Sequence, residues 1–150
     1  MKRGKLTGLY LAAALIVSGC GQKTADTVMQ DGSYTAQMSD FSHAWKEYVT
    51  ITVKNGSIVT TEFNAENASG FIKQWDNAYM QNMKAISGTY PNEYTRYYAA
   101  QLTGQSELPE IDALSGASTS GSNFEKLSKA VVEQAIKGDS KVVFVDAEPE

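Results

Sequence analysis

The sequence predicts an α+β fold, a small antiparallel sheet with helices packed on it. Three observations favour this class. Alternating apolar and polar residues come first, between positions 32 and 63; segments with helical spacing follow; and a short apolar segment, 141–145, closes the folded part. This segregated order disfavours a doubly wound parallel sheet, in which strands and helices alternate along the chain.

The first three strands are expected from alternation and from one turn signal. Residues 32–38 alternate, and residues 48–53 alternate more strictly. Asn55-Gly56 follows, the dipeptide best suited to the positive φ angles of a two-residue hairpin turn. We therefore expect residues 57–63 to return as the partner strand of a β-hairpin.

Two helices are expected next. From Gly70 onward the apolar residues fall at helical spacing, which predicts one stripe facing the core, and Gly88 ends the segment. That stripe comprises Phe71, Ile72, Trp75, Ala78, Tyr79, Met83 and Ile86. Pro91 suits the first position of a second helix, in which Tyr94, Tyr98 and Leu102 recur every four residues.

A long loop and a last helix complete the expected order. Residues 104–121 are polar and rich in glycine and serine, and a loop of this length is usually functional or disordered. Residues 122–125, Ser-Asn-Phe-Glu, fit a capping box that opens a helix, and Gly138 fits the position just after its end. Residues 141–145 are expected to form the closing strand.

Composition excludes several classes of function. A single cysteine leaves no internal disulfide framework and no cysteine-based zinc site, and a single histidine argues against a histidine-rich metal site and an ordinary Ser-His-Asp triad. The net charge is −4, and the first 19 residues hold cations but no acid, so the rest of the chain is more acidic still. Nucleic acid is therefore not an expected partner.

The N-terminus has the organisation of a bacterial export signal. Cations precede the apolar run Leu9–Val17, which is too short to span about 30 Å of hydrocarbon. Val17-Ser18-Gly19-Cys20 then resembles the lipobox of bacterial lipoproteins, whose cysteine is lipidated; the alternative is an ordinary signal peptide with an incidental cysteine. The expected organisation is a signal peptide over 1–19, lipidated Cys20 and a flexible tether over 20–30, the folded domain over 31–146, and a frayed tail over 147–150.

The loop before the last helix carries the expected chemistry. It is crowded with hydroxyls and small residues, which leave a hydroxyl accessible to a second protein's active site. The free N–H groups of the following helix suit a phosphate. A serine needs a base to act as a nucleophile, and His43 is distant in sequence, so Ser118 is expected to be an acceptor that another enzyme modifies.

Asp112-x-x-Ser115-Gly116-Ala117-Ser118 resembles the flavinylation motif, Asp-x-x-(Ser/Thr)-Gly-Ala-(Thr/Ser), of the FMN-binding domain family. That family includes the flavin-carrying subunits of sodium-pumping NADH:quinone reductase and of the Rnf complex. In it a magnesium-dependent flavin transferase moves FMN from FAD onto the last hydroxyl of the motif. The resemblance implies a covalent FMN on Ser118, with Thr119 as the alternative acceptor because the usual last residue is threonine. Asp112, Ser115, Gly116 and Ala117 would complete the cofactor-binding motif.

The resemblance extends over about residues 30–140 and includes the segments 31–36, 70–76 and 90–97. It implies an FMN-binding domain-like fold and a membrane-anchored, extracytoplasmic electron carrier rather than an enzyme. The carrier would contact the lipid bilayer through Cys20 and relay electrons from a membrane quinone- or NADH-linked donor to an external acceptor.

Two alternatives share the same anchor. The chain can be a ligand-binding or structural lipoprotein without a redox role, or the precursor of a pheromone peptide released from its signal sequence. Within the carrier hypothesis, the candidates to line the flavin ring, or else simply to form core, are Trp75, Tyr79, Tyr90, Tyr94, Tyr97 and Tyr98. His43 and Arg96 are expected at the surface.

Overall fold

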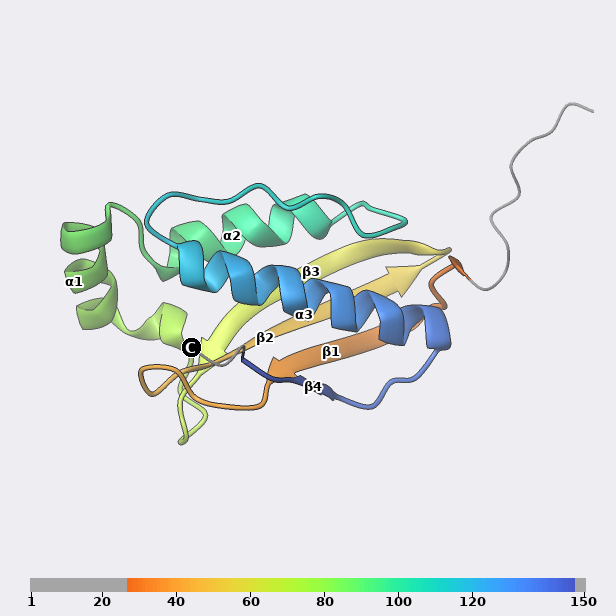
Figure 1. Cartoon of the computed structure of the whole chain (residues 1–150), viewed down its shortest axis with the longest axis horizontal. Coiled ribbons are helices and arrows are strands. Elements are labelled where there is room, and N and C mark those ends of the chain that lie inside the picture. The colour runs from red at the N-terminus through yellow and green to blue at the C-terminus, as the bar shows by residue number, and fades with distance from the viewer. Residues whose placement is uncertain (1–26, 148–150) are drawn as a thin grey trace, which may run out of the picture.

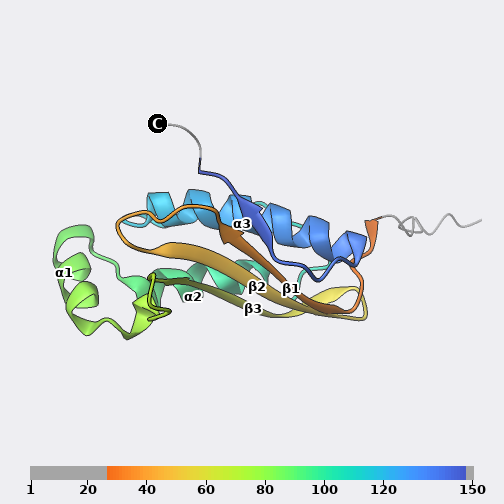
Figure 2. The same cartoon turned by 90° about the horizontal axis from the view of Figure 1, so that it is seen from below.

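The computed structural model describes residues 27–147, so the expected signal peptide and Cys20 lie outside the described residues. Four strands form one sheet in the order β3-β2-β1-β4, and helices α2 and α3 cover one of its faces (Figure 1, Figure 2). The elements are β1 Gly32–Met38, β2 Lys46–Lys54, β3 Ser57–Glu66, the 3-10 helix η2 Lys73–Trp75, α1 Asn77–Ser87, α2 Pro91–Leu102, α3 Ser118–Lys137 and β4 Val143–Val145. The predicted α+β class is confirmed.

The sheet is mixed rather than fully antiparallel. β1 pairs antiparallel with β2, and β2 with β3, but β4 lies parallel to β1 with Ala36 opposite Val143. The closing strand begins at Val143, two residues later than expected. A parallel partner follows from the topology, because α3 runs back along the sheet and returns the chain in the direction of β1.

One face of the sheet is apolar and the other polar. Ala36, Val49 and Phe63 lie side by side across β1, β2 and β3, and all three are buried. On the opposite face the hydroxyls of Thr35 and Thr50 lie 2.9 Å apart. This alternation places the apolar face toward the core. It also fixes the register, because a shift by one residue would turn the apolar side chains toward solvent.

The expected hairpin is confirmed. Asn55 and Gly56 have φ angles of 53° and 72°, the left-handed pair that a type I′ turn requires. The second helix is also confirmed: α2 begins at Pro91 and buries Tyr94, Tyr98 and Leu102 against the sheet and α3.

The prediction of a core-facing stripe between Gly70 and Ile86 is wrong for most of its residues, although Met83 packs against the core. The segment is divided into η2 and α1, and α1 has no buried residue. The side chains of Trp75 and Ile86 are 66% and 86% exposed. Asp76 breaks the helical run because it adopts an extended conformation and caps α1, which then projects beyond the end of the sheet (Figure 1). Helical spacing was present, but only Tyr79, which meets Trp45, and Met83, which packs against the core, use it for such contacts.

The expected start of the last helix is also wrong. α3 begins at Ser118, four residues before the capping box, so the loop is shorter than 104–121. Ser122, the expected cap, therefore lies inside the helix, and the neighbouring Asn123 donates a hydrogen bond to the carboxylate of Glu47 at 2.7 Å. Gly138 ends the helix in the left-handed conformation, as expected.

The end of the expected tether belongs to the folded domain. Met29 is 2% exposed and is part of the core, and the backbone N–H of Gln30 donates to the carbonyl of Ala135 at 2.8 Å. The large apolar side chain of Met29 thus extends the domain toward the N-terminus, beyond the expected boundary at residue 31.

Candidate functional site

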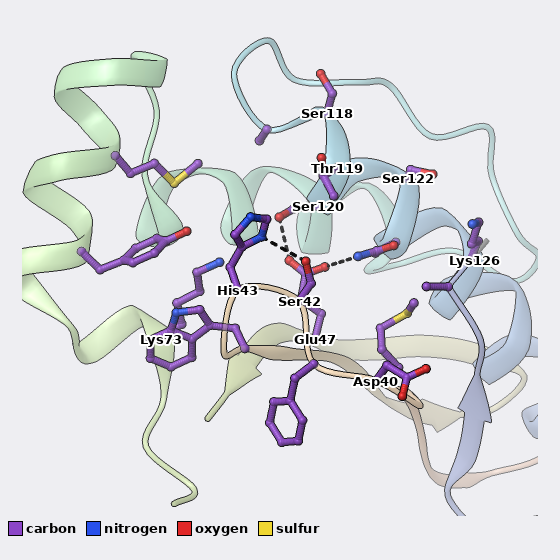
Figure 3. Close-up of a pocket in the computed structure, with 18 of the residues that line it drawn as sticks. Asp40, Ser42, His43, Glu47, Lys73, Ser118, Thr119, Ser120, Ser122 and Lys126 are labelled. Carbon is purple, nitrogen blue, oxygen red and sulfur yellow. Dashed lines mark hydrogen bonds between the residues drawn. The ribbon is translucent and has the colours of Figure 1, made fainter. Parts of the chain in front are cut away.

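A pocket of about 760 Å³ lies at the end of the sheet next to α1 (Figure 3). Its walls come from the connection between β1 and β2, from η2 and α1, and from the first turns of α3. Its lining residues include His43, Trp45, Glu47, Lys73, Tyr79 and the segment 116–120.

The pocket brings together the second half of the expected flavinylation motif. Gly116, Ala117, Ser118 and Thr119 all line it, whereas Asp112 and Ser115 do not. Ser118, expected on a flexible loop, is instead the first residue of α3, and Figure 3 shows it at the rim, pointing away from Glu47. The acceptor candidates are therefore held by a helix, in a fixed relation to the cavity.

Gly116 has a conformation and a contact that exclude a side chain. Its φ is +83°, and a Cβ at this position would lie 2.2 Å from the carbonyl oxygen of Ser87. The glycine therefore lets the motif contact the last residue of α1. This contact places the motif against the C-terminal end of α1.

Tyr98 holds the motif from beneath. Its hydroxyl accepts a hydrogen bond from the backbone N–H of Leu114 at 2.9 Å and donates one to the carbonyl of Ala117 at 3.3 Å. Asp112 is held only through its backbone, by the side-chain amide of Gln101. The buried hydroxyl of Tyr98 thus orders the residues on either side of Gly116, and Tyr98 is a positioning residue and not a ring-lining one.

The N-terminus of α3 has no side-chain cap. Ala117 occupies the N-cap position, and the first intrahelical hydrogen bond runs from Gly121 to Ala117 at 2.9 Å. The backbone N–H groups of residues 118–120 therefore have no carbonyl partner within the helix, and the helix dipole adds positive potential at this point. Both properties favour an anionic group bound at Ser118.

Glu47 forms the floor of the pocket below α3. It is 7% exposed, and its two carboxylate oxygens accept hydrogen bonds from Ser120 Oγ at 2.6 Å and from Asn123 Nδ2 at 2.7 Å (Figure 3). Burying a carboxylate is costly unless hydrogen bonds stabilise it, and these two bonds tie the first turns of α3 to β2.

Lys73 lies beside Glu47 and is 8% exposed. Burial alone lowers the pKa of its ammonium group, but Tyr94, Tyr79 and Glu47 outweigh burial, so the pKa is raised above its ordinary value. Burial raises the pKa of the Tyr94 hydroxyl, against the influence of Lys73 and with that of Glu47. At neutral pH the pocket therefore contains a charged lysine, and the hydroxyl of Tyr94 in the adjoining core is protonated.

The connection between β1 and β2 supplies the facing wall. Ser42 and Trp45 exchange backbone hydrogen bonds of 2.8 and 3.0 Å around His43 and Ala44, whose φ angles are +50° and +69°. Left-handed conformations are unfavourable for residues with a Cβ and occur often at functional sites. His43 is exposed, as expected, but it also lines the pocket, and its Nδ1 lies 3.2 Å from the Ser42 hydroxyl.

Most of the expected ring-lining aromatics are elsewhere. Of the six, Tyr79 lines the pocket, Tyr94 and Tyr98 are core residues, and Trp75, Tyr90 and Tyr97 lie outside its walls. Arg96 is exposed, as expected, and is not a pocket residue.

Sequence reasoning missed Trp45, Glu47 and Lys73. One signal for Glu47 was present, because it shares the strand face of Val49, Ile51 and Val53, and a charge on a buried face is unusual. Nothing in the local pattern around Lys73 distinguishes it from a surface lysine.

Comparison with known proteins gives distant relatives. No known family profile matches the chain. The chain is 26% identical over 144 residues to the 15 kDa lipoprotein of Treponema pallidum (strain Nichols), covering 95% of this chain and 97% of that protein. The crystal structure of the CPE2226 protein from Clostridium perfringens superposes with a TM-score of 0.71 at 28% identity, over 80% of this chain and 99% of that one. The chain is thus a distant homologue of a lipoprotein.

Within residues 27–147, no helix combines the length and the hydropathy needed to cross a bilayer.

Proposed function

We propose that the chain is a lipid-anchored, extracytoplasmic electron carrier that holds FMN through a phosphoester to Ser118. It is a substrate of a separate magnesium-dependent flavin transferase and not itself an enzyme. One observation carries the proposal: Gly116, Ala117, Ser118 and Thr119, which match the end of the flavinylation motif, line a single pocket at the N-terminus of α3.

The pocket suits a flavin nucleotide in size. Its volume of about 760 Å³ falls within the roughly 300–1,000 Å³ of small-molecule sites. Gly116 and Ala117 add little bulk beside the acceptor, so a group attached to Ser118 has space to enter. Trp45 and Tyr79 offer aromatic surfaces to a planar ring system.

The helix N-terminus suits the phosphate. A phosphodiester carries one negative charge, and the uncapped N–H groups of residues 118–120 can donate to its oxygens. In the transfer, Ser118 Oγ bonds to the phosphorus of the FMN half of FAD. The diphosphate P–O bond breaks, AMP leaves, and the serine proton passes to a base of the transferase. The protein's own contribution is to hold the hydroxyl exposed at the rim.

Bound FMN supplies reversible electron transfer, and the protein supplies tethering, orientation and tuning. Glu47 and Tyr98 fix the acceptor turn from below through Ser120 and Ala117. The carrier therefore needs no group that breaks a substrate bond.

The location of the pocket suits exchange with a partner outside the membrane. The N-terminal segment joins the domain at Gln30, which bonds to Ala135 near the C-terminal end of α3, whereas Ser118 begins that helix. A helix of 20 residues is about 30 Å long. The first described residues therefore lie at the end of the domain opposite the pocket (Figure 1).

The lipobox at Cys20 and the relationship to a lipoprotein support the anchor. A diacylglycerol provides two chains, enough for stable attachment to a bilayer. Electrons would come from a membrane quinone- or NADH-linked donor and pass to an external acceptor.

Intact-mass measurement tests the proposal. The mature protein is co-expressed with a magnesium-dependent flavin transferase, alongside Ser118→Ala, Thr119→Ala and Ser115→Ala. We expect the mass of FMN less water on the parent, Thr119→Ala and Ser115→Ala, and its loss from Ser118→Ala. An unmodified parent, or an undiminished increment on Ser118→Ala, overturns the proposal.

The pocket would equally serve a ligand-binding lipoprotein without a redox role. Colour distinguishes the two, because a covalently flavinylated protein stays yellow after denaturation and desalting. A colourless protein that binds a small molecule in this pocket would support the alternative.

A further inference from the structure

Among the charged groups that line the pocket, Asp40 and Lys126 included, Lys73 is the buried cation, and the proposed attachment at Ser118 gives it no role. The side chain of Lys73 lines the pocket and is 8% exposed. A lysine is almost never buried in this way unless its charge is compensated. It is positioned by η2, where the N–H of Trp75 bonds to the carbonyl of Ile72 at 3.0 Å and Ile72 bridges to Glu66 of β3. The backbone of Lys73 is thus fixed against the sheet.

The ammonium group of Lys73 lies among aromatic rings. Nζ is 4.6 Å from the ring centre of Tyr79 and 5.9 Å from that of Trp45, and the two rings meet edge to face with centroids 6.0 Å apart. Together the three side chains form one wall of the pocket, in which two aromatic rings provide apolar surface and the ammonium group provides a positive charge. We call Trp45, Lys73 and Tyr79 the aromatic-lysine wall.

The charge of this wall persists at neutral pH. The pKa of Lys73 is raised because Tyr94, Tyr79 and Glu47 together outweigh its burial. Glu47 is one of the groups that raise this pKa, and its carboxylate oxygens accept hydrogen bonds from Ser120 and Asn123. Lys73 therefore presents a fixed positive charge to a ligand in the pocket.

We propose that the isoalloxazine ring of an FMN held at Ser118 lies against the aromatic-lysine wall, and that Lys73 raises the reduction potential of this flavin. The inference rests on the proposed function. Two electrons and one proton convert the neutral oxidised ring into a ring with one negative charge. A nearby cation stabilises the charged reduced form more than the neutral oxidised form, so it makes reduction more favourable.

Glu47 acts in the opposite sense. Its carboxylate lines the same pocket and would disfavour the negative charge of the reduced ring. Neutralising Lys73 and neutralising Glu47 should therefore shift the potential in opposite directions. If a variant only loosened the packing, its effect on the reduction potential would not depend on the sign of the charge removed.

The experiment compares midpoint potentials of flavinylated proteins. The parent, Lys73→Gln, Lys73→Arg, Glu47→Gln and Lys84→Gln are each titrated with dithionite against a dye of known potential. Lys84→Gln is the matched control, because Lys84 is an exposed lysine of α1 that does not line this pocket.

We expect Lys73→Gln to weaken the preference for reduced over oxidised flavin about tenfold, a fall of about 30 mV for the two-electron couple. Lys73→Arg should restore most of the potential, Glu47→Gln should raise it, and Lys84→Gln should leave it unchanged. Flavin fluorescence should also rise in Lys73→Gln/Trp45→Leu, because the ring loses its aromatic contact.

Three outcomes overturn the inference. If Lys73→Gln carries FMN and keeps the parent potential, the inference fails and the proposed function stands. If Lys73→Gln does not fold, the sign of the shift in Glu47→Gln decides, and no rise means failure. If the parent takes no FMN after co-expression with the transferase, both the inference and the proposed function fail.

Discussion

The absence of a side chain at Gly121 makes room for the hydroxyl of Tyr98. A Cβ at position 121 would lie 2.3 Å from that oxygen. The same hydroxyl bonds to Leu114 and Ala117 on either side of Gly116, so the close contact between α2 and α3 also orders the motif.

This contact predicts that Gly121→Ala destabilises the protein although alanine is the better helix former by about 1 kcal/mol. Overpacking against Tyr98 should cost about 1–3 kcal/mol and exceed that gain. Urea denaturation of Gly121→Ala, Tyr98→Phe and the double variant measures the coupling. The double variant should be more stable than the sum of the single effects, because Tyr98→Phe removes the nearest atom that the new methyl group meets, the hydroxyl oxygen at 2.3 Å, although the ring carbon at 2.8 Å remains. Additive effects would contradict this assignment.

Gly116→Ala should be more harmful than Gly88→Ala. Both glycines have positive φ angles, +83° and +76°, but a Cβ at position 88 meets nothing within 4 Å whereas one at 116 would meet the carbonyl of Ser87. Backbone strain alone costs about 1–2 kcal/mol, which both variants share. The extra loss of stability in Gly116→Ala, together with a lower yield of flavinylation, reports the contact between α1 and the motif. Equal losses would mean that this contact does not matter.

Met29→Ala should cost about 2–5 kcal/mol of unfolding free energy, as expected for a buried methionine. Val28→Ala is the control, since Val28 is 37% exposed and Met29 is 2% exposed. Thermal denaturation of the mature protein compares them. A difference below the error of the measurement would mean that residues up to 30 belong to the tether after all.

Stability should decline in alkaline solution. The folded-state pKa values of Lys73, Tyr94 and Tyr48 are all raised, so each group contributes stability below its unfolded-state pKa and loses it as pH rises toward the folded-state value. The ordinary pKa values are 10.0 for tyrosine and 10.5 for lysine, so the decline should begin near pH 10. Urea denaturation between pH 8 and about 11 measures it. Tyr94→Phe should show a shallower decline than the parent, and an identical slope would contradict the role of Tyr94.

Local sequence signals predicted the elements that contact the sheet. The hairpin turn follows directly from the Asn55-Gly56 dipeptide. The second helix begins at Pro91, and the sheet covers its face with Tyr94 and Tyr98. Trp75 and Ile86 belong to a stripe with the same spacing but are exposed, because spacing alone does not report whether a partner surface exists.

The candidate site was also predictable only in part, because local sequence patterns do not report tertiary contacts. The motif around Ser118 is contiguous in sequence, so it could be recognised directly. Glu47, Lys73 and Trp45 come from separate elements and meet only through the tertiary fold. The early start of α3 likewise depends on tertiary contacts, because Ser120 and Asn123 bond to Glu47 on a distant strand.

Peptide mapping tests covalent attachment at Ser118 most directly. Trypsin cuts after Arg96 and Lys126, so residues 97–126 form one peptide that contains the entire motif. After co-expression with the flavin transferase, this peptide should absorb in the visible range and carry the mass of FMN less water, and fragment ions should place that mass on Ser118. An unmodified peptide 97–126, or a flavin located on any other residue, would contradict the assignment.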